Sequence, residues 1–240
     1  MIDDLSVFRG KDFELNTNIV ICQPTLDDIC DYGEQRYFGL VRTLCATPAD
    51  KKVEIWDALH IYWDEMDEFD LFISIYSSMR NEDLSIIFRD MDFSSFQPVL
   101  NPKTSEVLLR NKDGVIIDRA IHALMTDYIR RMHHFKKNVD VGFNDYTKDV
   151  MIEDDRDEQM RLMNSKFTSF LLPMVSSLTN SAEFKYRFDD VWTLPIGAFM
   201  DAVERIHKLK SYNYMMYGIY SGCVDIKKIN RKDLNWMGEL

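Results

Sequence analysis

The sequence predicts an α+β fold that is predominantly α-helical, with an N-terminal β-hairpin and a small antiparallel sheet inserted around residues 85–117. Apolar residues recur at steps of three or four over most of the chain, which is the spacing of a single buried helix face. Between residues 85 and 117 they form short runs separated by Asp, Asn, Pro and Gly instead. Because no internal repeat or low-complexity linker interrupts the chain, we expect one domain over residues 1–240.

The predicted hairpin lies at the N-terminus. Residues 7–8 and 13–15 carry its apolar side chains and flank the polar turn 9–12, which contains a glycine. A second apolar run follows at residues 19–22. We therefore expect extended structure before the first helix.

A long helix is expected after this run. Thr25 is a suitable N-cap, because its hydroxyl can accept a hydrogen bond from the first helical turn. Asp27 and Asp28 place carboxylates at the positive end of the helix dipole. The helix is predicted to extend to about Leu44, with Gly33 and Gly39 marking close backbone approaches or weak points.

Similar signals predict the remaining elements. Thr47 followed by Pro48 repeats the helix start signal, and Asp118 is an expected N-cap. Further helices are expected over about residues 47–59, 64–79, 118–135, 145–163, 171–178, 195–210 and 212–220, with breaks at Asn180, Pro195 and Gly218; the inserted strands are expected at residues 85–88, 93–96, 107–109 and 115–117.

The net charge disfavours nucleic-acid partners. With 40 acidic and 29 basic side chains, the chain has a formal net charge of -11 and repels phosphate backbones. Residues 130–137 combine cations with an aromatic side chain, but this basic segment is too short to reverse the expectation.

The charges are unevenly distributed along the chain. Seven acidic residues and no Lys or Arg lie between Lys52 and Arg80, whereas residues 205–232 carry seven Lys or Arg and the single acid Asp225. Two solvated faces explain this distribution. Head-to-tail pairing of neighbouring copies is the alternative, and it leaves a homo-oligomer open.

Cysteine usage and hydropathy indicate a reducing, aqueous compartment. The four cysteines show no CxxC spacing and lie in apolar or mixed runs, as reduced core cysteines do. The N-terminus has no signal-peptide pattern, and no segment reaches the ~18 apolar residues of a membrane span. We expect a cytoplasmic protein with no membrane partner.

Residues suited to catalysis are sparse. His133 and His134 are adjacent, but neighbours on a helix point about 100° apart, so both cannot readily ligate one ion. The acidic run 153–158 is explained by the solvated side of a helix. No HExxH, GxSxG or P-loop pattern is present. We therefore expect no enzymatic activity, no cofactor and no metal; a metal-dependent hydrolase that uses these acids and histidines is the alternative of another class.

Aromatic and methionine side chains gather near the C-terminus and predict a partner surface there. Tyr, Trp and Met are enriched at the centres of protein interfaces. A helix that is buried on several sides is the alternative explanation. The candidate partner-binding residues are Tyr212, Tyr214, Met215, Met216, Tyr217, Tyr220 and Trp236.

Several stretches without catalytic content carry a family resemblance. Those in the N-terminal part are Phe8-Arg9-Gly10, Asn18-Ile19, Pro24–Ile29, Tyr32-Gly33-Glu34, Tyr37-Phe38 and Thr47-Pro48-Ala49-Asp50. Those in the C-terminal part are Arg205-Ile206, Met216–Gly222, Val224-Asp225 and Leu234-Asn235-Trp236. With these stretches the chain resembles, almost end to end, small proteins from the structural gene modules of tailed phages and prophages of Gram-positive bacteria. Such proteins are described as tail or baseplate assembly proteins.

The resemblance implies a role in virion morphogenesis without catalysis. It implies a tail assembly chaperone-like factor that binds other phage tail proteins, such as tape-measure or baseplate components, in the host cytoplasm. The alternative is a structural subunit that is retained in the tail or baseplate of the virion. An acidic, aromatic-rich helical protein suits the first role, because it can cover apolar stripes of a partner while its charge maintains solubility.

Overall fold

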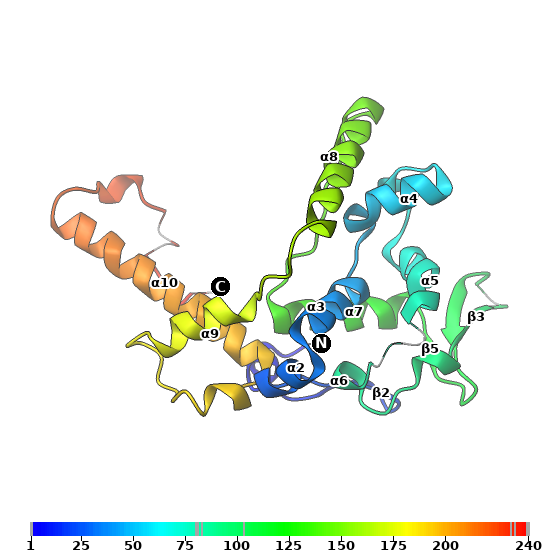
Figure 1. Ribbon diagram of the computed structural model, residues 1–240, viewed down its shortest axis with the longest axis horizontal. Helices are drawn as coiled ribbons and strands as arrows, with labels where there is room; N and C mark the ends of the chain where they lie inside the picture. The colour runs from blue at the N-terminus through cyan, green and yellow to red at the C-terminus, as the bar shows by residue number, and fades with distance from the viewer. Residues whose placement is uncertain are drawn as a thin grey trace.

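Two helical arms project from a mixed body in the computed structural model, which describes residues 2–79, 82, 84–102, 104–230, 232 and 234–238 (Figure 1). The fold is α+β and mostly helical, as predicted. The arms are formed by α8 (Asp145–Met163) and α10 (Ile196–Tyr220). The other α-helices are α1 (Asp4–Phe8), α2 (Leu26–Tyr32), α3 (Glu34–Leu44), α4 (Lys52–Leu59), α5 (Glu68–Met79), α6 (Ser85–Phe88), α7 (Arg119–His133) and α9 (Leu171–Thr179).

Short 3-10 turns and two small sheets complete the fold. The turns are η1 (Pro48–Lys51), η2 (Trp63–Glu65), η3 (Phe93–Ser95), η4 (Val191–Thr193) and η5 (Ile226–Lys228). The strands are β1 (Phe13–Asn16), β2 (Ile19–Ile21), β3 (Gln97–Leu100), β4 (Val107–Arg110) and β5 (Ile116–Ile117). No helix in the described part of the chain combines the length and apolar composition needed to cross a membrane.

The predicted N-terminal hairpin is present, but it is formed by β1 and β2, with Phe13 opposite Ile21. The extended structure expected at residues 7–8 is wrong, since these residues belong to α1. The carboxylate of Asp3 accepts hydrogen bonds from the first turn of α1. This N-cap stabilises a helical turn locally, which the apolar pair alone does not reveal.

The first long helix is divided in two. Thr25 caps it as predicted, in a capping box with Asp28. The helix does not run uninterrupted to Leu44, because Gly33 has a φ of 96° and ends α2. Glycine adopts this backbone conformation without the steric cost that a side chain would add. Of the two predicted glycines, Gly33 therefore interrupts the helix between α2 and α3, whereas Gly39 lies within α3.

The inserted antiparallel sheet is confirmed, with strand order β3-β4-β5. The strands expected at residues 85–88 and 93–96 are wrong, since α6 and η3 occupy these positions. Ile87 is fully buried, and its carbonyl accepts the N–H of Cys22 at 2.8 Å. Residues 85–88 are too few for the spacing of their apolar side chains to distinguish a helix from a strand. Their conformation is therefore decided by packing against distant parts of the chain. β3 contains Pro98, which an edge strand tolerates because it needs fewer donors.

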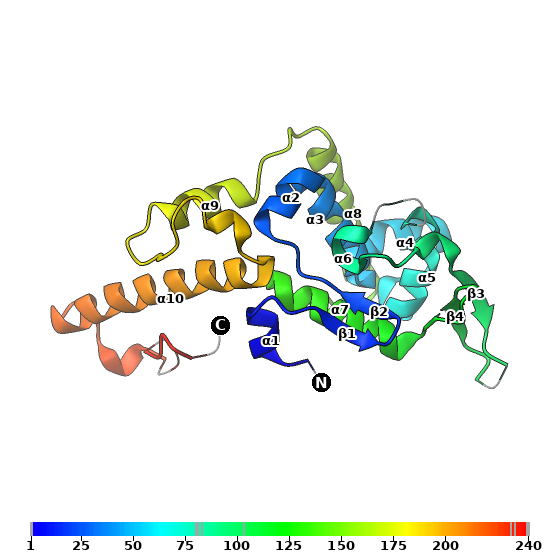
Figure 2. The same ribbon diagram turned by 90° about the horizontal axis from the view of Figure 1, so that it is seen from below.

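The main core surrounds α7, which contacts α1, α5, α10, β1 and β5 (Figure 2). Asp118 caps this helix as predicted. The buried side chains Met125, Tyr128, Ile129 and Met132 follow the spacing of one helix face. A smaller core joins α4, η2, α5 and α8.

The C-terminal part of the chain shares the main core. Ile196 and Phe199, at the start of α10, are fully buried in it. A carboxylate oxygen of Glu34 accepts the N–H groups of Phe170 and Leu171 at 2.6 and 2.7 Å. Glu34 therefore satisfies free donors at the N-terminus of α9 from a distant part of the sequence.

Candidate partner interface

The second half of α10 leaves the body of the molecule. The buried residues of this helix end at Met200, and none of its later side chains is buried. The helix is continuous to Tyr220, so the break predicted at Gly218 is wrong. After Tyr220 the chain returns alongside the helix (Figure 2). We call the described residues of 207–238 the C-terminal arm.

Gly218 allows the returning chain to pack closely against α10. A Cβ atom at this position would lie 2.7 Å from Cγ2 of Val224, well inside van der Waals contact. The N–H of Val224 donates to the carbonyl of Gly218 at 3.0 Å. Nearer the body, the guanidinium of Arg205 donates to the carbonyl of Trp236 at 3.1 Å. These contacts fix the returning chain along one side of the helix.

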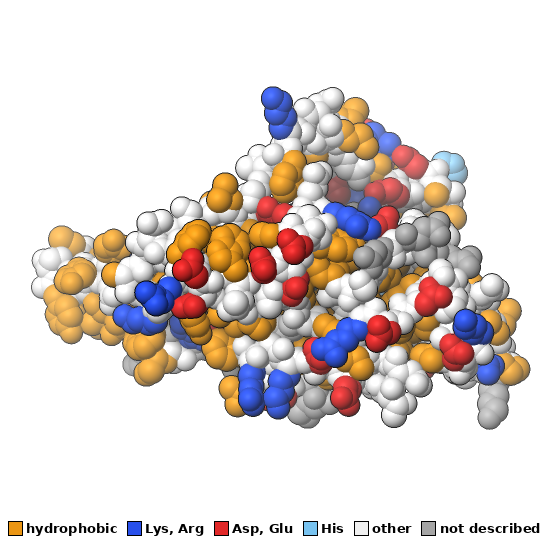
Figure 3. Space-filling view, turned by 60° about the horizontal axis from the view of Figure 1, so that its bottom comes forward, with side chains coloured by type: hydrophobic (Ala, Val, Ile, Leu, Met, Phe, Trp, Pro, Cys, Tyr) orange, Lys and Arg blue, Asp and Glu red, His pale blue; other side chains and the backbone are white. Residues whose placement is uncertain are grey.

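Three tyrosines stand on the open side of the arm. Tyr214, Tyr217 and Tyr220 are 75%, 72% and 80% exposed, and they follow one another at steps of three. This spacing makes them neighbours on the helix surface. Hydrophobic side chains gather at the far end of the arm (Figure 3). We call these three residues the tyrosine stripe; tyrosine is among the residues that dominate interface energetics.

A groove of about 1210 Å³ lies between α10 and the end of α7. Tyr212 and Met215 contribute apolar surface to it. Arg131 also lines the groove, but it is already paired with Asp4 at 2.7 Å and with Asp127 at 3.2 Å. The positive charge of Arg131 is therefore largely offset by these carboxylates and is not free to attract an acidic ligand to the groove.

The predicted partner-binding residues divide among three environments. Tyr214, Tyr217 and Tyr220 form the exposed stripe, Tyr212 and Met215 line the groove, and Met216 and Trp236 are half-buried. The structure thus brings three of them together on one open surface.

The basic segment 130–137 offers little free positive charge. Arg130 and Lys137 both form ion pairs with Glu68, and His134 lies 3.2 Å from a carboxylate oxygen of Glu204. Nucleic-acid binding requires cations that can replace the counterions of the phosphate backbone. The ion pairs at this segment disfavour that function, in agreement with the net charge.

His133 is held inside the core with both ring nitrogens engaged. Its Nδ1 lies 2.7 Å from the carbonyl of Ile129, and its Nε2 lies 2.6 Å from the hydroxyl of Tyr37. A carbonyl only accepts, so Nδ1 donates to Ile129 and Nε2 accepts from Tyr37. Burial lowers the pKa of His133 to about 4. This neutral, fully engaged imidazole has no nitrogen free to bind a metal or to act as a base.

The acidic run 153–158 lies on α8 and is partly used in ion pairs. Asp155 pairs with the buried Lys52 at 3.1 Å, and Arg156 pairs with Asp57 at 2.7 Å. Over the described residues, no group of three His, Cys, Asp or Glu side chains comes together in a way that could hold a metal ion. The run attaches α8 to α4 and otherwise faces solvent.

A family model matches the C-terminal part of the chain. Residues 165–240 match the model described as the YomV second domain. This family is phage-associated, from Bacillus prophages, and the match fits a phage protein. The match covers α9, η4, α10 and the arm, and hence every candidate partner-binding residue. No curated protein and no solved structure matches the chain.

Proposed function

We propose that this protein is a non-enzymatic factor of phage morphogenesis that binds another phage tail protein through the tyrosine stripe. The observation that carries the proposal is the exposure of Tyr214, Tyr217 and Tyr220 on a projecting helix. These residues lie in the segment that matches a phage-associated family. A tyrosine brings a large rigid contact surface and a hydroxyl that can still form hydrogen bonds at the edge of an interface.

The proposed activity is that of a tail assembly chaperone-like protein in the host cytoplasm. Its partner is a tail component with an exposed apolar stripe, such as a tape-measure or baseplate protein. The arm covers that stripe, and the net charge of -11 opposes aggregation of the complex. The engaged ring nitrogens of His133 and the ion-paired acids of α8 support a role without catalysis.

Replacement of the stripe is expected to abolish capture of the partner while the fold is retained. The tagged protein is recovered from phage-producing cells, and co-purifying phage proteins are quantified by mass spectrometry. For Y214A/Y217A/Y220A we expect the recovery of one phage tail protein to fall at least about tenfold, because interface tyrosines often contribute more than ~1 kcal/mol each. Exposed substitutions of this kind change stability by only about 0.5 kcal/mol.

Tyr186→Ala is the matched control, since Tyr186 is 51% exposed and lies outside the arm. Its recovery of the tail protein should equal that of the unmodified chain. Equal recovery by the triple variant would show that the stripe is not the partner surface.

A chaperone and a retained subunit differ in the mature particle. Mass spectrometry of purified virions should detect the protein in far less than stoichiometric amounts. If the protein is present in stoichiometric amounts, it is a structural subunit of the tail or baseplate and not a chaperone.

A further inference from the structure

The outward face of α8 carries acidic and apolar side chains that no described part of the chain covers. Tyr146 and Val150 are 77% and 43% exposed there. Asp154 and Asp157 continue the same face at helical spacing, and both are exposed. Neither forms an ion pair with a described residue, whereas Asp155, on the opposite side, is bound to Lys52.

Most of the acidic side chains between Lys52 and Arg80 are already neutralised. Six of the seven form ion pairs, with the cations Lys51, Arg119, Arg130, Lys137, Lys148 and Arg156. The seventh, Glu65, accepts the N–H of Tyr62. Among the acids on this side of the molecule, Glu65 and the α8 residues Asp145, Asp149, Asp154 and Asp157 form no ion pair with a described residue, so much of the unpaired negative charge lies on α8.

The far end of the C-terminal arm has the opposite character. Lys227 and Lys228 are exposed in η5, and neither forms an ion pair with a described residue. Apolar surface surrounds them, since Ile226 is 53% exposed and Val224 is 38% exposed. We call Val224–Lys228 the lysine tip.

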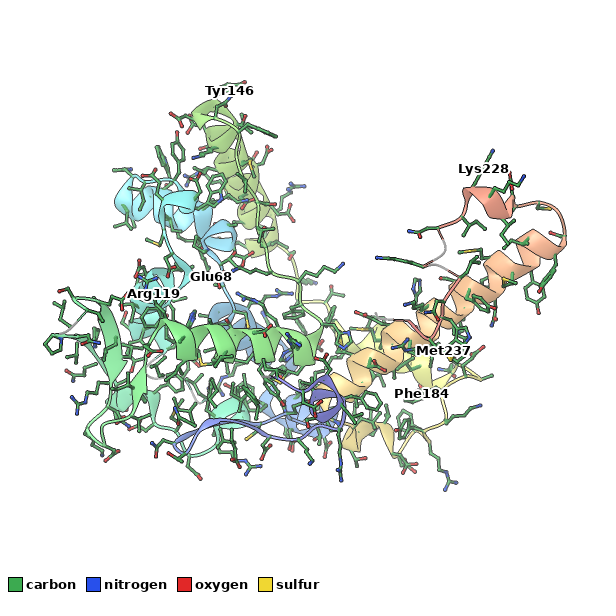
Figure 4. All side chains as sticks on the ribbon, turned by 180° about the vertical axis from the view of Figure 1, so that it is seen from behind. Glu68, Arg119, Tyr146, Phe184, Lys228 and Met237 are labelled. Atoms are coloured by element: carbon green, nitrogen blue, oxygen red, sulfur yellow. The ribbon has the colours of Figure 1, made fainter. Side chains whose placement is uncertain are left out.

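These two faces cannot meet within one chain. Tyr146 marks the end of α8 and Lys228 marks the end of the arm, and the two project in different directions from the body (Figure 4). Two copies can bring them together. Each face offers what the other lacks: unpaired carboxylates with apolar side chains on α8, and unpaired ammonium groups with apolar side chains on the tip.

We propose that copies of this chain associate head to tail, with the outward face of α8 in one copy docked on the lysine tip of the next. Exposed apolar groups supply contact area, and the opposite charges set orientation and register. Because the contact joins two different patches, a docked pair keeps one free patch of each kind, so the assembly can grow further into a ring or an open chain. This inference does not rest on the proposed function, because it concerns the purified chain alone.

Charge reversal tests this proposal by analytical ultracentrifugation of the full-length purified protein at low ionic strength. The unmodified chain should reach masses above a dimer as its concentration rises. K227E/K228E and D154K/D157K should each weaken the association at least about tenfold, because like charges would then face each other. The chain that carries all four substitutions should associate again, because the reversed charges are once more complementary.

K112E/K185E is the control for a general charge effect, since Lys112 and Lys185 are exposed elsewhere on the molecule. It should associate like the unmodified chain. A chain that stays monomeric at every concentration would overturn the proposal. The proposal would also be overturned if either charge reversal left the association unchanged. It would likewise be overturned if the chain with all four substitutions failed to associate again. Circular dichroism confirms folding of each variant.

Discussion

Lowering the pH from 7.5 to 5.0 is expected to reduce the free energy of unfolding by about 4 kcal/mol, half from His122 and half from His133. Both side chains are buried, and burial lowers the pKa of each to about 4 from the ordinary value near 6.5. The ring centroids of His122 and Phe72 lie 4.4 Å apart, and in this apolar packing a charged imidazole would be poorly solvated. Protonation of His133 would also place a donor against the hydroxyl proton of Tyr37.

Stability falls at lower pH because the unfolded chain takes up protons that the folded chain does not bind. Well above pH 6.5 both histidines are neutral in either state, and their contribution to stability does not change with pH. Between pH 6.5 and 4 the unfolded chain binds the protons and the folded chain does not, so stability falls as the pH falls. Carboxyl groups with a lowered pKa, such as Asp57, contribute mainly below about pH 5.

Urea denaturation at the two pH values measures this effect. His122→Phe should retain the aromatic packing and reduce the loss to about 2 kcal/mol, because one titrating group is removed. A pH dependence of the same size in this variant would show that other groups are responsible.

Phe199→Ala is expected to lower the free energy of unfolding by about 3–5 kcal/mol, the usual cost of removing a fully buried phenyl ring. Phe199 has no exposed surface and joins the start of α10 to the core around α7. Since the core is continuous across the two parts of the chain, we expect a single unfolding transition at lower urea concentration.

Tyr217→Ala provides the contrast on the same helix. Tyr217 is 72% exposed, and its loss should change the free energy of unfolding by no more than about 0.5 kcal/mol. A loss below about 1 kcal/mol in Phe199→Ala, or a separate early transition, would contradict the shared core.

Much of the helical framework was predictable because capping is local. Thr25 and Asp118 each accept a hydrogen bond from the turn that follows, and α2 and α7 begin as expected. Thr47 caps the 3-10 turn η1 instead, and α4 begins only after it, at Lys52. The missed α1 had the same signal in Asp3. Residues 85–88 had no such signal, and their helical turn depends on burial against distant parts of the chain.

The division of α10 into a buried and a free half was not predictable from residue pattern. Apolar side chains occur on all sides of the helix, so their spacing identifies no single buried face. The free half exists because the chain after Gly218 folds back on one side only and leaves Tyr217 uncovered. Likewise, the free acids of α8 become apparent only once Lys52 and Arg156 are seen to neutralise their neighbours.

Hydroxyl-radical footprinting of the partner complex tests the central claim most directly. The complex recovered from phage-producing cells is compared with the free protein, and oxidation is measured at each tyrosine. We predict that oxidation of Tyr214, Tyr217 and Tyr220 falls severalfold in the complex while that of Tyr186 is unchanged. Unchanged oxidation of the stripe, with protection at another surface, would contradict the claim that the C-terminal arm binds the partner.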